Sequence, residues 1–253
     1  MNATPLPTPM TDWPYPRWIA HRGAGKLAPE NTLAAFRLGA QHGYRMFECD
    51  AKLSADGEVF LMHDATLERT TNGQGVGGEL SWHRLSQLDA GGWHSRTHAG
   101  EPLPRLEALA RFCLANGYHL NIEIKPTPGT EQRTGEVVAR EAARLWAGQS
   151  VPPLLTSFQP DALLGARASA PELPRGLLLD TLWDGWLEQA QALGCVAVVC
   201  NYALWDATTV ARVHAAGMRA LSYTVNDDWA AQHLIALGTD GIITDRVDFF
   251  SPA

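Results

Sequence analysis

Acidic and basic side chains alternate with apolar ones in two short β-rich segments of this sequence. In MFECDAKL, Glu48 and Asp50 are two residues apart, and in LNIEIK, Glu123 and Lys125 have the same spacing. Side chains two residues apart point to the same face of a β-strand. We therefore expect each pair to project together from one face of its strand.

Two histidines fall at the ends of neighbouring segments. His21 and Arg22 end the apolar run WIAHR, and the stretch SADGEVFLMHD brings His63 close to the end of the strand that carries Glu48 and Asp50. A single histidine that ends a strand is more often structural than catalytic, and one glutamate–lysine pair is as readily explained by a structural salt bridge. Convergence of all these side chains on neighbouring strands favours a functional site.

Three clustered carboxylates repel one another and raise one another's pKa values unless positive charge compensates them. Glu48, Asp50 and Glu123 therefore need a cation, or ion pairs with Arg22 and Lys125. Oxygen ligands without thiolates suit Mg²⁺ or Ca²⁺ better than a soft metal. We expect one divalent cation, and the sequence leaves the choice between Mg²⁺ and Ca²⁺ open.

The elements that must position these residues alternate between short β-rich runs and amphipathic helical patterns. This alternation predicts a parallel sheet with helices packed outside it. Eight strands in about 250 residues favour an α/β fold of the (β/α)₈ TIM barrel type, whose active sites lie at the carboxyl ends of the strands. The expected strands are 18–22, 46–53, 120–125, 154–158, 176–180, 196–200, 220–225 and 241–245.

One stretch interrupts the alternation between the second barrel strand and the second barrel helix. Residues 54–64 read as a hairpin that turns at Asp56 and Gly57. Residues 64–103 then form a polar, glycine-rich insertion, and an excursion of this length in a compact domain is usually functional. We expect a single catalytic barrel domain over residues 1–253, with 64–103 as a lid or cap within it.

The composition narrows the classes of partner. The chain has 253 residues, a net charge of −7 and no basic tract, which argues against nucleic-acid binding. No apolar run approaches the length of a transmembrane segment. The four cysteines lie in apolar segments without CxxC spacing, and the proline-rich start, expected to be an irregular arm on the body of the protein over residues 1–17, lacks the features of a signal peptide. We expect a soluble, cytoplasmic protein, and its oligomeric state stays open.

Several motifs in a fixed order carry a resemblance to a known family. The segments HRGAGKLAPENTLAAF, FECDAKLSADGEVFLMHD and NIEIK, followed by TSF, YTVND and GIITD, resemble the glycerophosphodiester phosphodiesterases, and LERTTNGQG and PLPRLEAL extend the match. The resemblance covers the chain from about residue 17 to 250. It implies a (β/α)₈ barrel with a small insertion between strand 2 and helix 2. It also implies metal-dependent hydrolysis of a small-molecule glycerophosphodiester, such as glycerophosphocholine or glycerophosphoethanolamine, to sn-glycerol 3-phosphate and an alcohol.

Roles follow from the resemblance position by position. It implies His21 and His63 as the acid–base histidines, Glu48, Asp50 and Glu123 as metal ligands, and Arg22 and Lys125 as phosphate-binding cations. Phe158, Tyr223 and Asn226 are candidates for the pocket wall, and the family often has tryptophan where Tyr223 stands. These roles agree with elementary chemistry, because imidazole titrates near neutrality and cations stabilise the charge of an attacked phosphodiester.

The expected mechanism passes through a cyclic phosphate intermediate. The neighbouring glycerol hydroxyl attacks the phosphorus and forms a cyclic phosphate, which water then opens, and the sequence leaves open which histidine begins as the base. A lysophospholipase D or a phospholipase C type phosphodiesterase on the same barrel is the alternative, although the polar insertion favours a water-soluble substrate. A non-catalytic barrel is disfavoured because no histidine or acidic ligand is missing.

Overall fold

The computed structural model describes residues 13–252. The expected arm of residues 1–17 therefore falls largely outside the described residues. Its described part, 13–17, is irregular in backbone conformation. Tyr15 in this part is buried, and its hydroxyl donates a hydrogen bond of 2.8 Å to the carbonyl oxygen of Pro152.

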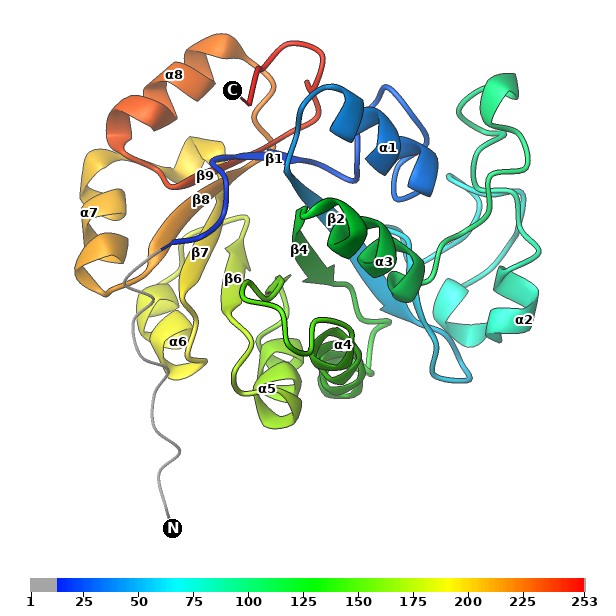
Figure 1. Ribbon diagram of the computed structural model, residues 1–253. Coiled ribbons are helices and arrows are strands. Elements are labelled where there is room, and N and C mark those ends of the chain that lie inside the picture. The colour runs from blue at the N-terminus through cyan, green and yellow to red at the C-terminus, as the bar shows by residue number, and fades with distance from the viewer. Residues whose placement is uncertain (1–12, 253) are drawn as a thin grey trace.

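Eight parallel strands close into a barrel, as the sequence predicts. Their order around the barrel is β1-β9-β8-β7-β6-β5-β4-β2, and pairing of β2 with β1 completes the circle (Figure 1). The barrel strands are β1 (Trp18–Ala20), β2 (Met46–Leu53), β4 (His119–Ile124), β5 (Leu154–Ser157), β6 (Arg175–Leu179), β7 (Ala197–Asn201), β8 (Arg219–Tyr223) and β9 (Gly241–Thr244).

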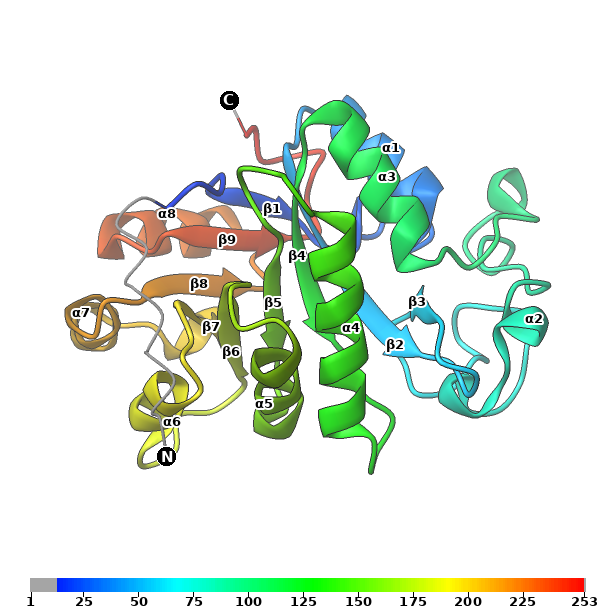
Figure 2. The same cartoon turned by 60° about the horizontal axis from the view of Figure 1, so that its bottom comes forward.

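Helices cover the outside of the barrel, and α4 and α5 pack closely side by side (Figure 2). They are α1 (Leu33–Gln41), α3 (Leu106–Asn116), α4 (Glu131–Leu145), α5 (Pro160–Ser169), α6 (Trp186–Ala192), α7 (Ala207–Ala215) and α8 (Asp228–Leu237). Helix α4 begins with the polar residues Glu131, Gln132 and Arg133, and the residues it buries come after them. None of the described helices combines the length and the apolar character needed to cross a membrane.

Strand β2 shows how the alternation of residue types builds the barrel. Phe47, Cys49 and Ala51 belong to the apolar cluster that joins the strands to the outer helices. The intervening Glu48 and Asp50 therefore face the barrel interior, and both are buried. The outward apolar side chains of β2 stabilise the fold by burial, whereas the inward Glu48 and Asp50 are available to bind a ligand.

The first strand is shorter than the sequence predicts. Strand β1 ends at Ala20, so His21 and Arg22 lie in the turn that follows it rather than in the strand 18–22. Arg22 has a φ of 50° and Gly23 a φ of 101°, so the chain reverses direction at once. Gly23 also lies against α1, since a Cβ atom there would come within 2.8 Å of Ala35. This tight turn brings Arg22 back over the barrel mouth.

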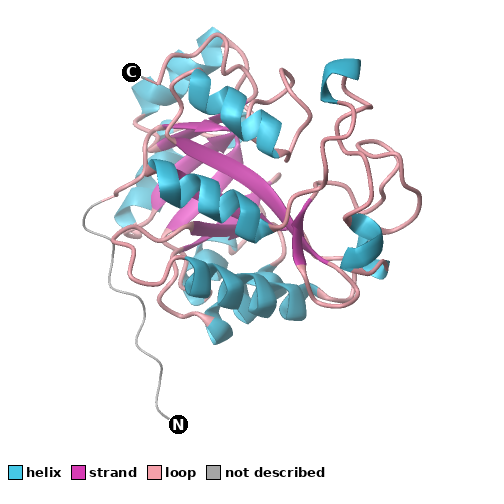
Figure 3. Cartoon of the chain, turned by 45° about the vertical axis from the view of Figure 1, so that its right-hand side comes forward, coloured by secondary structure: helices cyan, strands magenta, loops and turns pink. Residues whose placement is uncertain are grey.

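The hairpin and the segment after it form a lobe beside the barrel (Figure 3). Strand β3 (Val59–Leu61) pairs antiparallel with β2, and the turn at Asp56 and Gly57 is confirmed. Between β3 and α3 the chain contains η1 (Gly77–Glu79), α2 (Trp82–Leu85) and η2 (Arg96–His98). This lobe has an apolar cluster of its own, made of Phe60, Met62, Leu67, Leu85, Ala90 and Leu103.

Candidate active site

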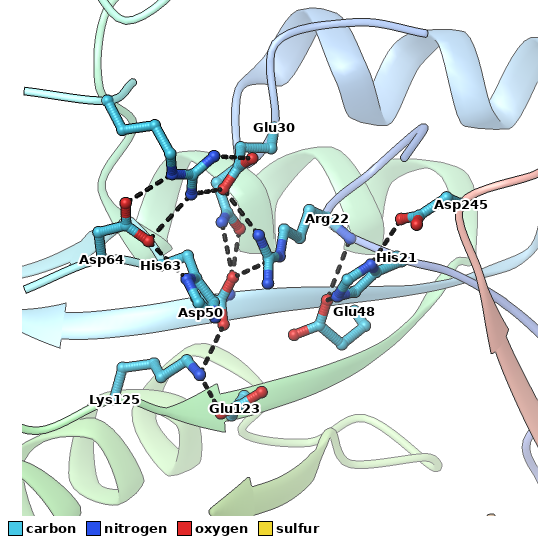
Figure 4. A network of polar contacts seen from close by, with 12 residues as sticks. His21, Arg22, Glu30, Glu48, Asp50, His63, Asp64, Glu123, Lys125 and Asp245 are labelled. Carbon is cyan, nitrogen blue, oxygen red and sulfur yellow. Dashed lines mark hydrogen bonds and ion pairs between the residues drawn. The ribbon is translucent and has the colours of Figure 1, made fainter. Parts of the chain in front are cut away.

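Three buried carboxylates meet at the carboxyl ends of two adjacent strands (Figure 4). Parallel pairing of β2 with β4 sets Asp50 opposite Glu123, and Glu48 lies one inward position below Asp50. One ligand oxygen from each of the three residues lies within 4.8 Å of the other two. The structure thus brings together the three residues that the sequence suggests as ligands of a divalent cation.

Two of the three carboxylates keep a buried oxygen atom without a partner, and the third faces Lys125. Glu48 Oε1 and Asp50 Oδ1 are buried and accept no hydrogen bond from the described residues. Lys125 Nζ lies 2.6 Å from Glu123 Oε1 and 3.7 Å from Asp50 Oδ1, and it compensates part of their charge. Three converging oxygen atoms of this kind fit a hard divalent cation.

The electrostatics of the three carboxylates are uneven. Burial, together with the charges of Asp50 and Glu123, raises the pKa of Glu48 well above its usual range. Burial and the charge of Asp50 raise the pKa of Glu123 to about 7. Burial acts on Asp50 as well, but the charges of Arg22 and Lys125 outweigh it and bring its pKa to about 2. Added positive charge would relieve the repulsion that the two glutamates experience.

The two basic side chains lie against this cluster. Arg22 Nε is 3.2 Å from Asp50 Oδ2, and its backbone N–H donates a hydrogen bond of 3.0 Å to Glu48 Oε2. Burial lowers the pKa values of Arg22 and Lys125, but the surrounding carboxylates prevail and raise both above their usual values. Both side chains therefore stay charged and can attract an anionic substrate.

Each of the two histidines has an aspartate on its Nδ1 atom. His21 Nδ1 is 2.7 Å from Asp245 Oδ1, and His63 Nδ1 is 2.7 Å from Asp64 Oδ1. An aspartate in this position favours the proton on Nδ1, which leaves Nε2 for exchange with a substrate. His21 Nε2 lies 3.9 Å from Glu48 Oε2, next to the carboxylate cluster. Burial, helped by the charges of Arg22 and Lys125, lowers the pKa of His63.

Of the expected wall residues, Phe158 lies beside Lys125 and Tyr223 packs against Phe158. Phe158 places its ring 5.4 Å from Lys125 Nζ and packs edge-to-face on Tyr223. The Tyr223 hydroxyl donates a hydrogen bond of 2.9 Å to the carbonyl oxygen of Leu179. These contacts fix both rings at the ends of β5 and β8.

Asn226 has a different environment from the other two. Its Nδ2 donates a hydrogen bond of 2.9 Å to Asp245 Oδ2, and its Oδ1 accepts one of 3.0 Å from the backbone N–H of Asp245. Asn226 thus orients the aspartate that holds His21. Asp245 follows β9 directly, and the rule that carboxyl ends of strands carry the site could have identified it from sequence.

Two further residues that the sequence analysis did not assign complete the network. Asn31 Nδ2 donates a hydrogen bond of 2.8 Å to Asp50 Oδ2, and Asn31 Oδ1 accepts one of 3.0 Å from the backbone N–H of Asp50. Glu30 Oε1 accepts a hydrogen bond of 2.9 Å from Arg22. Both lie in the PENT segment of the loop between β1 and α1, where only their place in that motif could have drawn attention to them.

Comparison with known proteins identifies the family. A model of the glycerophosphoryl diester phosphodiesterase family matches residues 21–249. The chain belongs to this family.

Several relatives of this glycerophosphodiester phosphodiesterase are similar over nearly their whole length. A glycerophosphodiester phosphodiesterase of Caldanaerobacter subterraneus subsp. tengcongensis is 31% identical, with 90% of this chain and 93% of the relative covered. A solved glycerophosphodiester phosphodiesterase of Agrobacterium tumefaciens is 30% identical, covers 94% of this chain and 100% of its own, and has a TM-score of 0.78.

A solved phosphodiesterase of Oleispira antarctica, in complex with the product sn-glycerol-3-phosphate, is also similar. It is 34% identical, covers 91% of this chain and 93% of its own, and has a TM-score of 0.85. The protein is accordingly an enzyme of the glycerophosphodiester phosphodiesterase class.

Proposed function

We propose that this enzyme hydrolyses small, water-soluble glycerophosphodiesters, such as glycerophosphocholine or glycerophosphoethanolamine. The products are sn-glycerol 3-phosphate and the free alcohol. The proposal rests on His21 and His63, each of which has an aspartate at its Nδ1 atom. They accompany three buried carboxylates and two cationic side chains, those of Arg22 and Lys125. A glycerophosphodiester carries one negative charge and needs proton transfer at two oxygens, which this set of groups can supply.

Glu48, Asp50 and Glu123 would hold one divalent cation, either Mg²⁺ or Ca²⁺. When bound, the cation supplies positive charge for the phosphoryl oxygens as negative charge develops on them. Arg22 and Lys125 bind the phosphate, since both stay charged and both face the carboxylate cluster. Phe158 and Tyr223 form an apolar wall beside Lys125 that excludes water from one side of the substrate.

The two histidines exchange protons with the substrate in two steps. In the first, Nε2 of one histidine takes the proton of the glycerol 2-hydroxyl while its oxygen bonds to phosphorus. The phosphorus–alcohol bond breaks, and the other histidine donates a proton to the leaving oxygen. In the second step water opens the cyclic phosphate and the histidines reverse their roles. General acid–base catalysis of this kind accelerates a reaction by roughly 10²- to 10⁴-fold.

We also propose that residues 64–103 act as a cap within a single catalytic domain, because Asp64 in this segment contacts His63 and Arg69 contacts Glu30 of the loop between β1 and α1. The four cysteines are buried free thiols, which supports a reducing compartment such as the cytoplasm.

Turnover of three matched substrates tests the proposal. We expect release of sn-glycerol 3-phosphate from glycerophosphocholine and no reaction with the analogue that lacks the glycerol 2-hydroxyl. Slower reaction of 1-acyl lysophosphatidylcholine than of glycerophosphocholine supports the water-soluble substrate. Faster reaction of the lysophospholipid favours the alternative, a lysophospholipase D or phospholipase C type enzyme. Equal cleavage of the deoxy analogue would exclude the cyclic phosphate.

A further inference from the structure

Arg69, in the lobe between β3 and α3, binds two carboxylates at once. Its Nε and Nη2 donate hydrogen bonds of 2.5 and 3.0 Å to the two oxygens of Asp64. Its Nη1 and Nη2 donate hydrogen bonds of 2.8 Å to the two oxygens of Glu30. The guanidinium group therefore uses four N–H donors on two edges to bind the two carboxylates.

Each of these carboxylates holds a residue of the proposed site. Asp64 Oδ1 is 2.7 Å from His63 Nδ1, and Glu30 Oε1 accepts a hydrogen bond of 2.9 Å from Arg22. Arg69 is therefore connected to His63 through Asp64, and to Arg22, the proposed phosphate-binding residue, through Glu30. No other described side chain is hydrogen-bonded to both Asp64 and Glu30.

The negative charges of Asp64 and Glu30 explain why a cation lies between these two carboxylates. Asp64 and Glu30 are both anions that face the same guanidinium, and without it they would repel each other. The hydrogen bonds from Arg69 are the largest cause of the lowered pKa of Asp64. Burial raises the pKa of Glu30, but Arg69 and Arg22 outweigh it and keep the carboxyl ionised.

The geometry also selects arginine over lysine. A planar guanidinium can bind two carboxylates in two-point contacts, whereas a lysine ammonium is a single point charge. The Arg69 side chain is 45% exposed, and an exposed ion pair contributes little to stability. Its loss should therefore affect the positions of its partners more than the folding of the chain.

We propose that Arg69 is a positioning residue that fixes His63 relative to Arg22, through Asp64 and Glu30. The role rests on the proposed function, because it assumes that His63 moves a proton while Arg22 binds the phosphate. His63 and Arg22 lie in different loops. Through Arg69, the imidazole that transfers the proton would stay at a constant distance from the phosphate that Arg22 binds. Displacement of such groups by about 1 Å can cost roughly 100-fold in rate.

Steady-state kinetics on glycerophosphocholine test the proposal with two variants and a control. We expect Arg69→Met to lower kcat by roughly 10- to 100-fold, as for other residues that orient catalytic groups, while KM changes less. Arg69→Lys should restore only part of the loss, because it keeps the charge without the two-point contacts. Arg84→Met is the control: Arg84 is exposed in the same lobe and forms no ion pair within residues 13–252, so kcat should stay within about twofold.

A coupling experiment separates positioning from a general structural effect. In the Glu30→Gln/Asp64→Asn background both anionic partners are gone, so Arg69→Met should change kcat by no more than about twofold. The same large loss in that background would overturn the proposal, as would wild-type kcat and KM in Arg69→Met itself.

A crystal structure of Arg69→Met gives a readout that does not depend on turnover. We expect the His63–Asp64 or the Arg22–Glu30 contact to open, with an unfolding temperature close to that of Arg84→Met. Unchanged positions of His63 and Arg22 would overturn the inference. Absence of turnover in the wild-type enzyme would instead contradict the proposed function, and this structure would still decide the role of Arg69.

Discussion

Asp245 Oδ1 lies 2.7 Å from His21 Nδ1, although the two residues are 224 positions apart in the chain. His21 follows the first barrel strand and Asp245 follows the last, and β1 and β9 are neighbours in the closed barrel. Closure of the barrel therefore assembles this pair. A second aspartate, Asp240, precedes β9, and its Oδ2 lies 2.8 Å from His214 Nε2. Strand β9 therefore has a histidine–aspartate pair at each end.

These two pairs supply a matched test of the role of Asp245. Asp245→Asn should lower kcat by roughly 10- to 100-fold, because the amide no longer holds the proton on Nδ1 of His21. Asp240→Asn should leave kcat within about twofold, since its pair lies at the other end of the barrel strand. Equal effects of the two substitutions on kcat would contradict the proposed role of Asp245.

Cation affinity should depend on pH through Glu123. Its pKa in the metal-free protein is raised to about 7, so below that value a cation must displace a proton. The apparent affinity for Mg²⁺ or Ca²⁺ should fall as the pH decreases from about 8 to about 6. Calorimetric titration of the metal-free protein in buffers of different ionisation enthalpy measures both the affinity and the protons released. Constant affinity without proton release would contradict this assignment.

The same shift has a consequence for stability. The folded-state pKa of Glu123 lies above the ordinary value of about 4.3, so the metal-free native state binds the extra proton between these values and loses stability as the pH rises through this window. The cation should therefore raise the unfolding temperature more at about pH 8 than at about pH 6. Thermal melts with and without the cation at the two pH values measure this difference. An equal increase at both would argue against the shift.

Glu48→Gln should separate stability from activity. The substitution replaces a carboxyl group whose charged form is disfavoured by burial and by the charges of Asp50 and Glu123, while an amide oxygen remains to accept the Arg22 backbone N–H. We expect the metal-free variant to unfold at the same temperature as the wild type or higher. Its activity should fall by at least roughly 100-fold, since a lost ligand costs no less than a lost orienting partner. A destabilised variant with full activity would contradict the assignment of Glu48 as a ligand.

Gly39 should be required for the turn that carries Arg22. A Cβ atom at this position of α1 would lie 2.1 Å from the carbonyl oxygen of Gly23 and 2.9 Å from the Phe47 ring. Gly39→Ala should destabilise the protein by about 1–3 kcal/mol, as overpacking does, and should raise KM by displacing Arg22. Chemical denaturation and kinetics check both effects. Wild-type values in both would show that the turn can move without consequence.

Much of this site could be predicted because it follows regular elements. Glu48 and Asp50 share a strand face by their spacing, and parallel pairing of adjacent strands then brings Glu123 to them. The eight strands were predictable for the same reason, since alternation and apolar runs repeat along the chain. The end of β1 was predicted two residues too late, because hydrophobicity alone does not show that the chain turns at His21.

The residues that the sequence did not assign act through long-range contacts between loops. Arg69 and Glu30 are 39 positions apart and both lie in segments without periodicity. Their pairing depends on how the lobe sits beside the barrel, and no local pattern specifies that arrangement. Asn226 was expected at the pocket wall, whereas its hydrogen bonds to Asp245 are visible only once β8 and β9 are in place.

The need of the site for a metal is tested by the release of sn-glycerol 3-phosphate from glycerophosphocholine, measured before and after EDTA treatment and after return of Mg²⁺ or Ca²⁺. We expect EDTA to abolish release and one of the two ions to restore it, whereas neither ion should restore release in the Glu48→Gln protein. Release that is unchanged after complete removal of metal, verified by elemental analysis, would contradict a metal-assisted site built on Glu48, Asp50 and Glu123.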